Sequence, residues 1–222
     1  MTWDRVQATI ITAAAVAVAA VLVHREFIGT TPVATPRRQP QPVAAWRDIL
    51  PAGRVIGNPN AKVMLIEFAD LECPFCRRFQ STLNQATAKY PNDVALVFVH
   101  LPLEMHRFSR YGAKMAECAA AQGRFRNMVD AIYQRQDSLG LRPRLAYALD
   151  AGLGDTVAFR RCVADTTTPP MVAKGLAAAR KLSLTATPTL LLNNWRFGGV
   201  PSDSELYRAI EDVLAGREPF RE

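Results

Sequence analysis

The chain has 222 residues, of which 49% are hydrophobic and 21% are charged. This composition is typical of a folded globular protein and excludes a disordered one. The net charge of +7 comes from basic residues scattered along the chain, with no stripe of Lys and Arg between aromatic residues. Nucleic-acid binding is therefore not indicated.

Residues 1–28 are predicted to form a membrane anchor or a signal peptide. The run from Ala8 to Val23 holds 16 apolar or weakly polar residues, fewer than the roughly 20 that cross a bilayer and slightly more than a signal-peptide core. His24 and Arg25 follow it where a cleavage site would need small residues. Two interpretations stay open, an uncleaved signal anchor and a cleaved signal peptide. A buried helix is disfavoured because the run has no polar face.

Residues 29–51 are predicted to be a linker. They contain five prolines, and proline favours an extended, semi-rigid backbone that cannot support a packed core. We expect this stretch to connect the membrane segment to a single domain over residues 52–222. That length is enough for a sizeable hydrophobic core.

The first half of the domain predicts a strand, a helix and a second strand. Residues 63–68 and 94–99 are short apolar runs that suit buried strands. A helix is expected over residues 74–89, because Pro74 favours the first helical position and leaves Cys73 as the N-cap. A strand–helix–strand order predicts parallel pairing through a right-handed crossover.

The second half begins with a helical block, an insertion expected over about residues 104–182. Residues 189–192 then read as a strand that pairs with residues 196–200 across a turn at 193–194. Ser202 and Glu205 have the spacing of a capping box, which opens a terminal helix that reaches about Leu214. The element order predicts a three-layer α/β/α domain with a helical insertion.

Cys73 and Cys76 form a Cys-Pro-Phe-Cys pair at the expected helix start. Backbone N–H groups without helical partners and the helix dipole both favour a thiolate at this position, and the thiolate is the nucleophile. Cys76 lies one helical turn further, where it can attack a mixed disulfide formed at Cys73. The pattern predicts a redox pair in which Cys73 attacks and Cys76 resolves.

Nearby charges act on the Cys73 thiol in both directions. Arg77 and Arg78 are expected to lower its pKa, whereas Asp70 and Glu72 are expected to raise it. A zinc site is disfavoured because the chain has no second close cysteine pair. We expect no metal and no cofactor. A purely structural disulfide between Cys73 and Cys76 is the remaining alternative.

With these features in place, residues 50–216 resemble the DsbA-like branch of the thioredoxin superfamily. The residues from Ile66 to Glu72 lead into the cysteines as they do in that family. Glu67 is similar to the buried acid that assists proton transfer at the resolving cysteine. A buried carboxyl has a raised pKa, which suits a general base; a solvated carboxylate is the alternative.

The resemblance implies two further features. Thr187 and Pro188 resemble the cis-proline loop that contacts substrate peptides, although Ala186 stands where the family often has glycine. Cys118 and Cys162 match members that carry a second disulfide, with two buried free thiols as the alternative. His106 is read as a packing or capping residue, since no motif links it to the cysteine pair.

The predicted function is an extracytoplasmic thiol–disulfide oxidoreductase that forms disulfides in exported proteins. The expected partners are those exported proteins and a membrane redox partner. The chain is expected to cross the cell membrane once, at its N-terminus, with the catalytic domain in the periplasm or another extracytoplasmic space. A reductase or isomerase on the same fold is the first alternative, because fold does not assign direction. A module that binds peptide or Cu(I) is the second.

Overall fold

The computed structural model describes residues 3–27 and 39–220 and divides into two units, residues 1–37 and 38–222. The first unit contributes one helix, α1 (Trp3–Phe27). Among the described residues, no helix has both the length and the apolar character needed to cross a membrane. The spanning anchor predicted over residues 1–28 is therefore not supported. The uninterrupted apolar run is short, at 16 residues against about 20.

The second unit is built on a six-stranded mixed sheet in the order β1-β6-β5-β3-β4-β2. The parallel pairing predicted between β3 and β4 is confirmed, and every other neighbouring pair is antiparallel. All seven residues of β3 and of β4 are buried, as their apolar runs predict. The strands are β1 (Gln41–Pro42), β2 (Arg54–Ile56), β3 (Val63–Ala69), β4 (Val94–His100), β5 (Thr189–Leu192) and β6 (Trp195–Arg196).

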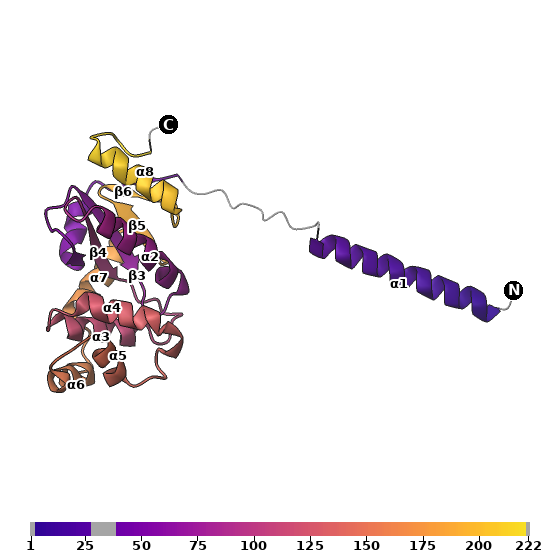
Figure 1. Ribbon diagram of the computed structural model, residues 1–222, viewed down its shortest axis with the longest axis horizontal. Helices are drawn as coiled ribbons and strands as arrows, with labels where there is room; N and C mark the ends of the chain where they lie inside the picture. Colours follow the sequence, from indigo (N-terminus) through magenta and orange to yellow (C-terminus); the bar gives the residue numbers. More distant parts are fainter. Residues whose placement is uncertain (1–2, 28–38, 221–222) are drawn as a thin grey trace. The chain divides into compact units, whose positions relative to one another are not determined.

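Helices cover both faces of this sheet, which confirms the three-layer architecture (Figure 1). Side chains alternate between faces along a strand, so Leu65 packs with α2 (Pro74–Lys89) and α8 (Asp203–Leu214). Ile66 faces the opposite side, where η1 (Trp46–Ala52) and α7 (Pro170–Lys181) complete a second cluster. The approach of α7 is close, because a Cβ on Gly175 would lie 2.3 Å from the carbonyl oxygen of His100.

A helical insertion follows β4, as predicted, and its helices gather at one end of the domain (Figure 1). The predicted end near residue 182 is too late, because α7 covers a face of the sheet instead. The apolar residues of the insertion form a third cluster that includes Cys73, Cys76 and Phe98. The insertion therefore packs directly against the cysteine pair. Its elements are α3 (Ser109–Ala120), α4 (Phe125–Gln134), η2 (Gln136–Ser138), α5 (Arg144–Asp150) and α6 (Thr156–Ala164).

Residues 29–51 were predicted to be a linker, but the second half of this stretch is part of the folded domain. Strand β1 pairs with β6, and Trp46 and Ile49 of η1 are buried in the core. The domain therefore begins before the predicted position 52. Proline is tolerated in an edge strand because the N–H group that it lacks is not needed for pairing on the open side of the strand. The first half of the predicted linker, residues 29–38, lies outside the described residues.

Candidate active site

Cys73 occupies the N-cap of α2 in an extended conformation, and Pro74 is the first helical residue. Proline suits this position because its fixed φ is helical and it has no N–H group to leave unpaired. Both cysteines are free thiols, and Cys73 and Cys76 expose only 3% and 0% of their surface. The helix start thus presents two buried thiols one turn apart.

The two thiols have opposite acidities. The pKa of Cys73 is lowered to about 5, chiefly by the hydrogen bond from the Cys76 side chain, with further contributions from Thr187 and the backbone of Cys76 and Phe75, while burial opposes the shift. The pKa of Cys76 is raised well above its ordinary value, first by burial and then by its hydrogen bond to Cys73. At neutral pH, Cys73 is therefore a thiolate and Cys76 keeps its proton.

Glu67 lies in the centre of β3, between Phe98 of β4 and Leu190 of β5. It alternates with Ile66 and Phe68, so its side chain shares the sheet face of Leu65 and the covering helix α2. The carboxyl is fully buried, and neither oxygen has a hydrogen-bond partner among the described residues. Burial is the main cause that raises its pKa to about 8, and the negative charge of Cys73 adds to it.

Thr187 and Pro188 immediately precede β5 and are joined by a cis peptide bond. The Cys73 sulfur lies 3.3 Å from the carbonyl oxygen of Thr187, to which it donates a hydrogen bond when it is protonated. The loop predicted to contact substrate therefore lies against the predicted nucleophile, although the two are 114 positions apart in sequence.

Asp70 has a structural position that the sequence did not indicate. Its carboxylate accepts hydrogen bonds from the backbone N–H groups of Glu72 and Leu103, at 2.8 and 2.7 Å, and lies 2.8 Å from Nδ1 of His106. Its own N–H donates to the sulfur of Cys76 at 3.5 Å. His106 thus acts through packing and hydrogen bonding to Asp70, which holds the loop before the cysteines.

Gln136 is a second residue that the sequence did not single out. This buried side chain of η2 donates to the carbonyl oxygens of Leu71 and Cys73 at 2.9 and 3.0 Å. It ties the insertion to the loop that carries the nucleophile, across 63 positions of sequence. No local pattern marks it, because its partners are backbone atoms that only the folded chain brings near.

The charged side chains beside the cysteines were predicted to act on the Cys73 thiol, but in the structure they contact other groups. Arg77 pairs with Asp137 at 3.0 Å, and the guanidinium of Arg78 lies 4.5 Å above the ring of Phe75. The carboxylate of Glu72 accepts the N–H of Phe108. The acidity of Cys73 therefore comes mainly from hydrogen bonds at the helix start, with Cys76 as the largest contributor.

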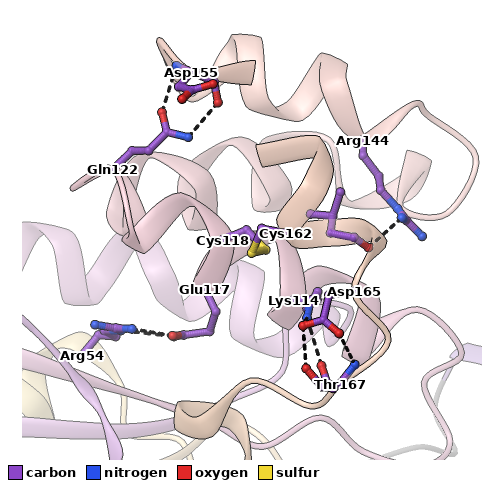
Figure 2. The surroundings of a disulfide bond; sticks show 11 residues. Arg54, Lys114, Glu117, Cys118, Gln122, Arg144, Asp155, Cys162, Asp165 and Thr167 are labelled. Carbon is purple, nitrogen blue, oxygen red and sulfur yellow. Dashed lines mark hydrogen bonds and ion pairs between the residues drawn. A yellow bond between two sulfur atoms is a disulfide. The ribbon is translucent and has the colours of Figure 1, made fainter. Parts of the chain in front are cut away.

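Cys118 and Cys162 form a disulfide that links α3 to α6 inside the insertion (Figure 2). Polar contacts surround it. Gln122 and Asp155 exchange two hydrogen bonds, and Lys114 lies 3.5 Å from Asp165. The bridge closes a loop of 44 positions, so in the chain-entropy model it constrains the unfolded chain by about 1 kcal/mol more than a bridge that closes 15 residues.

Replacing both cysteines of this bridge, as Cys118→Ala with Cys162→Ala, should lower the free energy of unfolding by about 2–4 kcal/mol. The upper figure is the loop-closure entropy expected for this separation. Urea denaturation of the variant and the parent under non-reducing conditions measures the difference. Exchange activity should persist, because Cys73 and Cys76 are untouched. A variant as stable as the parent would contradict the expected constraint.

The described part of the chain contains no group of three or more His, Cys, Asp and Glu side chains placed to hold a metal ion. The arrangement that it does contain is one acidic thiol, one thiol of high pKa and one buried carboxyl of raised pKa. These are the groups needed for exchange between a dithiol and a disulfide.

Comparison with known proteins agrees with this chemistry. The family profile described as Thioredoxin matches residues 50–212. The solved structure of DsbA2 from Pseudomonas aeruginosa is 30% identical, covers 73% of this chain and 93% of its own, and has a TM-score of 0.61. BdbD from Bacillus subtilis, at 21% identity, covers 75% and 95% with a TM-score of 0.66 and shares the fold.

Some relatives are named as ion transporters and not as thioredoxin-like proteins. A protein of Mycolicibacterium gilvum named Na(+)/H(+) antiporter NhaA 1 is 35% identical over 166 residues, which are 73% of this chain and 26% of that protein. The chain thus spans about a quarter of the length of such relatives, so the match concerns one segment of a longer protein. The family match and the likeness to DsbA2 show that this chain belongs to the thioredoxin superfamily, in its DsbA-like branch.

Proposed function

We propose that this chain forms disulfides in exported proteins by exchange through Cys73 and Cys76. The observation that carries the proposal is the difference in acidity between the two thiols, with Cys73 at a pKa of about 5 and Cys76 raised well above its usual value. A stabilised thiolate stabilises the reduced form of the pair, and a stable reduced form makes the disulfide a strong oxidant.

The exchange proceeds in two steps. A client thiolate attacks Cys73 in the Cys73–Cys76 disulfide, which forms a mixed disulfide and leaves Cys76 as a thiolate. Cys76 then takes a proton, for which Glu67 is the buried donor at its pKa of about 8. A second client thiolate attacks the client sulfur, so the client leaves oxidised and Cys73 leaves as its stable thiolate.

An extracytoplasmic location follows from the same proposal. The Cys118–Cys162 disulfide favours an oxidising compartment, since cytosolic thiols are kept reduced. A similar fold is found in a periplasmic thioredoxin-like protein from Salmonella enterica serovar Typhimurium, which is 22% identical with a TM-score of 0.61. The partners would be reduced exported proteins, together with a membrane redox protein that restores the disulfide. Thr187 and Pro188 are the proposed contact with the client backbone.

The reduction potential of the Cys73–Cys76 pair tests the proposed direction. Because the Cys73 thiolate is stabilised, the potential should be more oxidising than about −200 mV, towards the value of about −120 mV found for a strong disulfide donor. It is measured by equilibration in glutathione buffers, with free thiols counted by mass after alkylation. A value near about −270 mV would make the chain a reductase instead.

A further inference from the structure

Asp70 follows β3 directly, and its backbone is bonded to both cysteines of the active site. Its carbonyl oxygen accepts the N–H group of Cys73 at 3.1 Å, which closes a tight turn before α2. Its own N–H group donates to the sulfur of Cys76 at 3.5 Å. The residue is 1% exposed, so water does not compete for this N–H group. The Cys76 sulfur therefore has a buried backbone donor beside it.

The carboxylate of Asp70 is held by two segments. One oxygen accepts the N–H group of Glu72 at 2.8 Å, which is a local Asx turn. The other accepts the N–H group of Leu103 at 2.7 Å and lies 2.8 Å from Nδ1 of His106. Since an ionised carboxylate only accepts hydrogen bonds, this nitrogen is the donor. Two residues of the loop after β4 thus hold the residue whose N–H group reaches Cys76.

The Cys76 sulfur receives negative charge when the disulfide opens. A client thiolate attacks Cys73, the bond between Cys73 and Cys76 breaks, and its electron pair leaves with Cys76. A thiol of lower pKa is the faster leaving group. Burial is the main cause that raises the pKa of Cys76 well above its usual value, whereas the hydrogen bond from the Asp70 backbone lowers it. This N–H group therefore acts in the direction that favours departure of Cys76.

We propose that the Asp70 N–H group stabilises the thiolate that forms on Cys76 as the disulfide opens. Leu103 and His106 position this group through the Asp70 carboxylate. The inference rests on the function proposed above, because it concerns the step in which a client thiolate enters. One S–S bond forms as another breaks, and the charge passes from the client sulfur to Cys76. The N–H group stabilises that charge until Glu67 supplies a proton.

Opening of the oxidised pair by dithiothreitol, a small dithiol, tests the inference in the full-length protein. One thiolate of the reagent attacks Cys73 and expels Cys76, and its second thiolate then closes a cyclic disulfide and releases Cys73. The first step limits the rate wherever this rate is proportional to the reagent concentration. Alkylation at successive times, followed by the mass of the peptide that carries Cys76, gives the rate constant. This peptide separates the reaction from any reduction of the Cys118–Cys162 bridge.

The Asp70→Asn substitution should slow this opening by about tenfold. Asparagine keeps the Asx turn, but its amide nitrogen cannot accept the N–H group of Leu103, so the loop after β4 no longer holds the backbone in place. Loss of one donor to a developing charge slows a reaction by about a hundredfold or more, and here the donor is displaced and not removed. His106→Leu should slow the opening by less, since Leu103 still holds the carboxylate.

Two matched variants separate positioning from general loosening of the loop. His106→Asn again places a nitrogen on Cγ, where Nδ1 of histidine is bonded, and should restore the rate of the parent. Ser109→Ala removes a hydroxyl whose hydrogen bonds in the described part of the chain go to the carbonyl oxygens of Leu103 and His106, at 3.3 and 3.1 Å. It loosens the same loop without removing a partner of Asp70, so it should also open like the parent.

The reactivity of Cys73 in the reduced protein gives a second readout. Its alkylation by iodoacetamide breaks no bond to Cys76. At pH 7 this thiol, with its pKa of about 5, is already ionised, so its alkylation rate should stay close to that of the parent in every variant. A substitution that merely loosened the turn before α2 would change this rate together with the rate of opening.

Three results would overturn the inference. They are an Asp70→Asn variant that opens at the rate of the parent, the same slowing in Ser109→Ala, and equal slowing of Cys73 alkylation. Thermal unfolding verifies that each variant is folded. If Asp70→Asn is not, the comparison of His106→Leu with His106→Asn decides, and equal rates would refute the positioning. Failure of the proposed function looks different, since a reductase potential in the parent would reverse the direction of electron flow and leave these rate ratios unchanged.

Discussion

Cys73→Ser should lower the rate of thiol–disulfide exchange by at least about a thousandfold, as expected when the nucleophile of a covalent mechanism is removed. A serine hydroxyl at this position cannot form a disulfide. Cys76→Ser should give a different result, because its Cys73 remains a reactive thiol with no resolving partner. Mixed disulfides with glutathione or with a client peptide should therefore accumulate on Cys73.

Intact mass measured under non-reducing conditions distinguishes these outcomes. The Cys76→Ser variant should gain the mass of one glutathione, whereas Cys73→Ser should gain none, because Cys76 is buried and keeps its proton at neutral pH. The variant lacking the Cys118–Cys162 bridge serves as a control and should exchange like the parent. Adducts on Cys73→Ser would reverse the assigned roles of nucleophile and resolving thiol.

Glu67→Leu should stabilise the oxidised protein at pH 8 while slowing resolution of the mixed disulfide. The pKa of this carboxyl is raised from 4.5 to about 8 in the reduced protein, mainly by burial and further by the charge of Cys73. In the oxidised protein the Cys73 charge is absent and burial alone raises the pKa. The folded state then still holds a proton that the unfolded state has lost above about pH 4.5, so stability is fully present below that pH and decreases as the pH rises towards 8. Glu67→Leu has no carboxyl at this position, so this decrease should disappear in the variant.

Urea denaturation of the oxidised form across this pH range measures the effect, because the disulfide prevents both thiols from titrating. The unfolding free energy of the parent should fall from pH 5 to 8, and that of Glu67→Leu should change much less. Glu104→Leu is the matched control, since its side chain is 89% exposed, and it should follow the parent. Parallel curves for the parent and Glu67→Leu would show that Glu67 is ionised in the folded state.

Short-range features of this chain were predictable from its sequence. Pro74 after Cys73 indicated a helix start, and the apolar runs of β3 and β4 indicated buried parallel strands; both are confirmed. The capping box of Ser202 and Glu205 is also confirmed. Each of these depends on backbone preferences and hydrophobic spacing within a few residues. The redox chemistry was predictable for the same reason, because its two thiols are neighbours on one helical turn.

The surroundings of that pair were decided only by the tertiary structure. Asp70 and Arg77 are close to Cys73 in sequence, yet their side chains are held by His106 and Asp137 and not by the thiol. Residues 41–52 join the domain because β6 and the sheet offer them partners, which their proline content does not reveal. Gln136 reaches the site from an insertion whose local sequence is only helical.

The sequence by itself therefore indicated which atoms are expected to react: two thiols at a helix start, with Glu67 as a candidate proton acceptor. The tertiary structure decided how readily each of them reacts. Acidity depends on burial and on hydrogen bonds. The hydrogen bond from Cys76 to Cys73 is local, but the burial that raises the pKa of Cys76 and Glu67, and the contribution of Thr187 at Cys73, come from segments distant in sequence. Such contacts are set by the packing of elements across the whole domain, so no local sequence pattern encodes them.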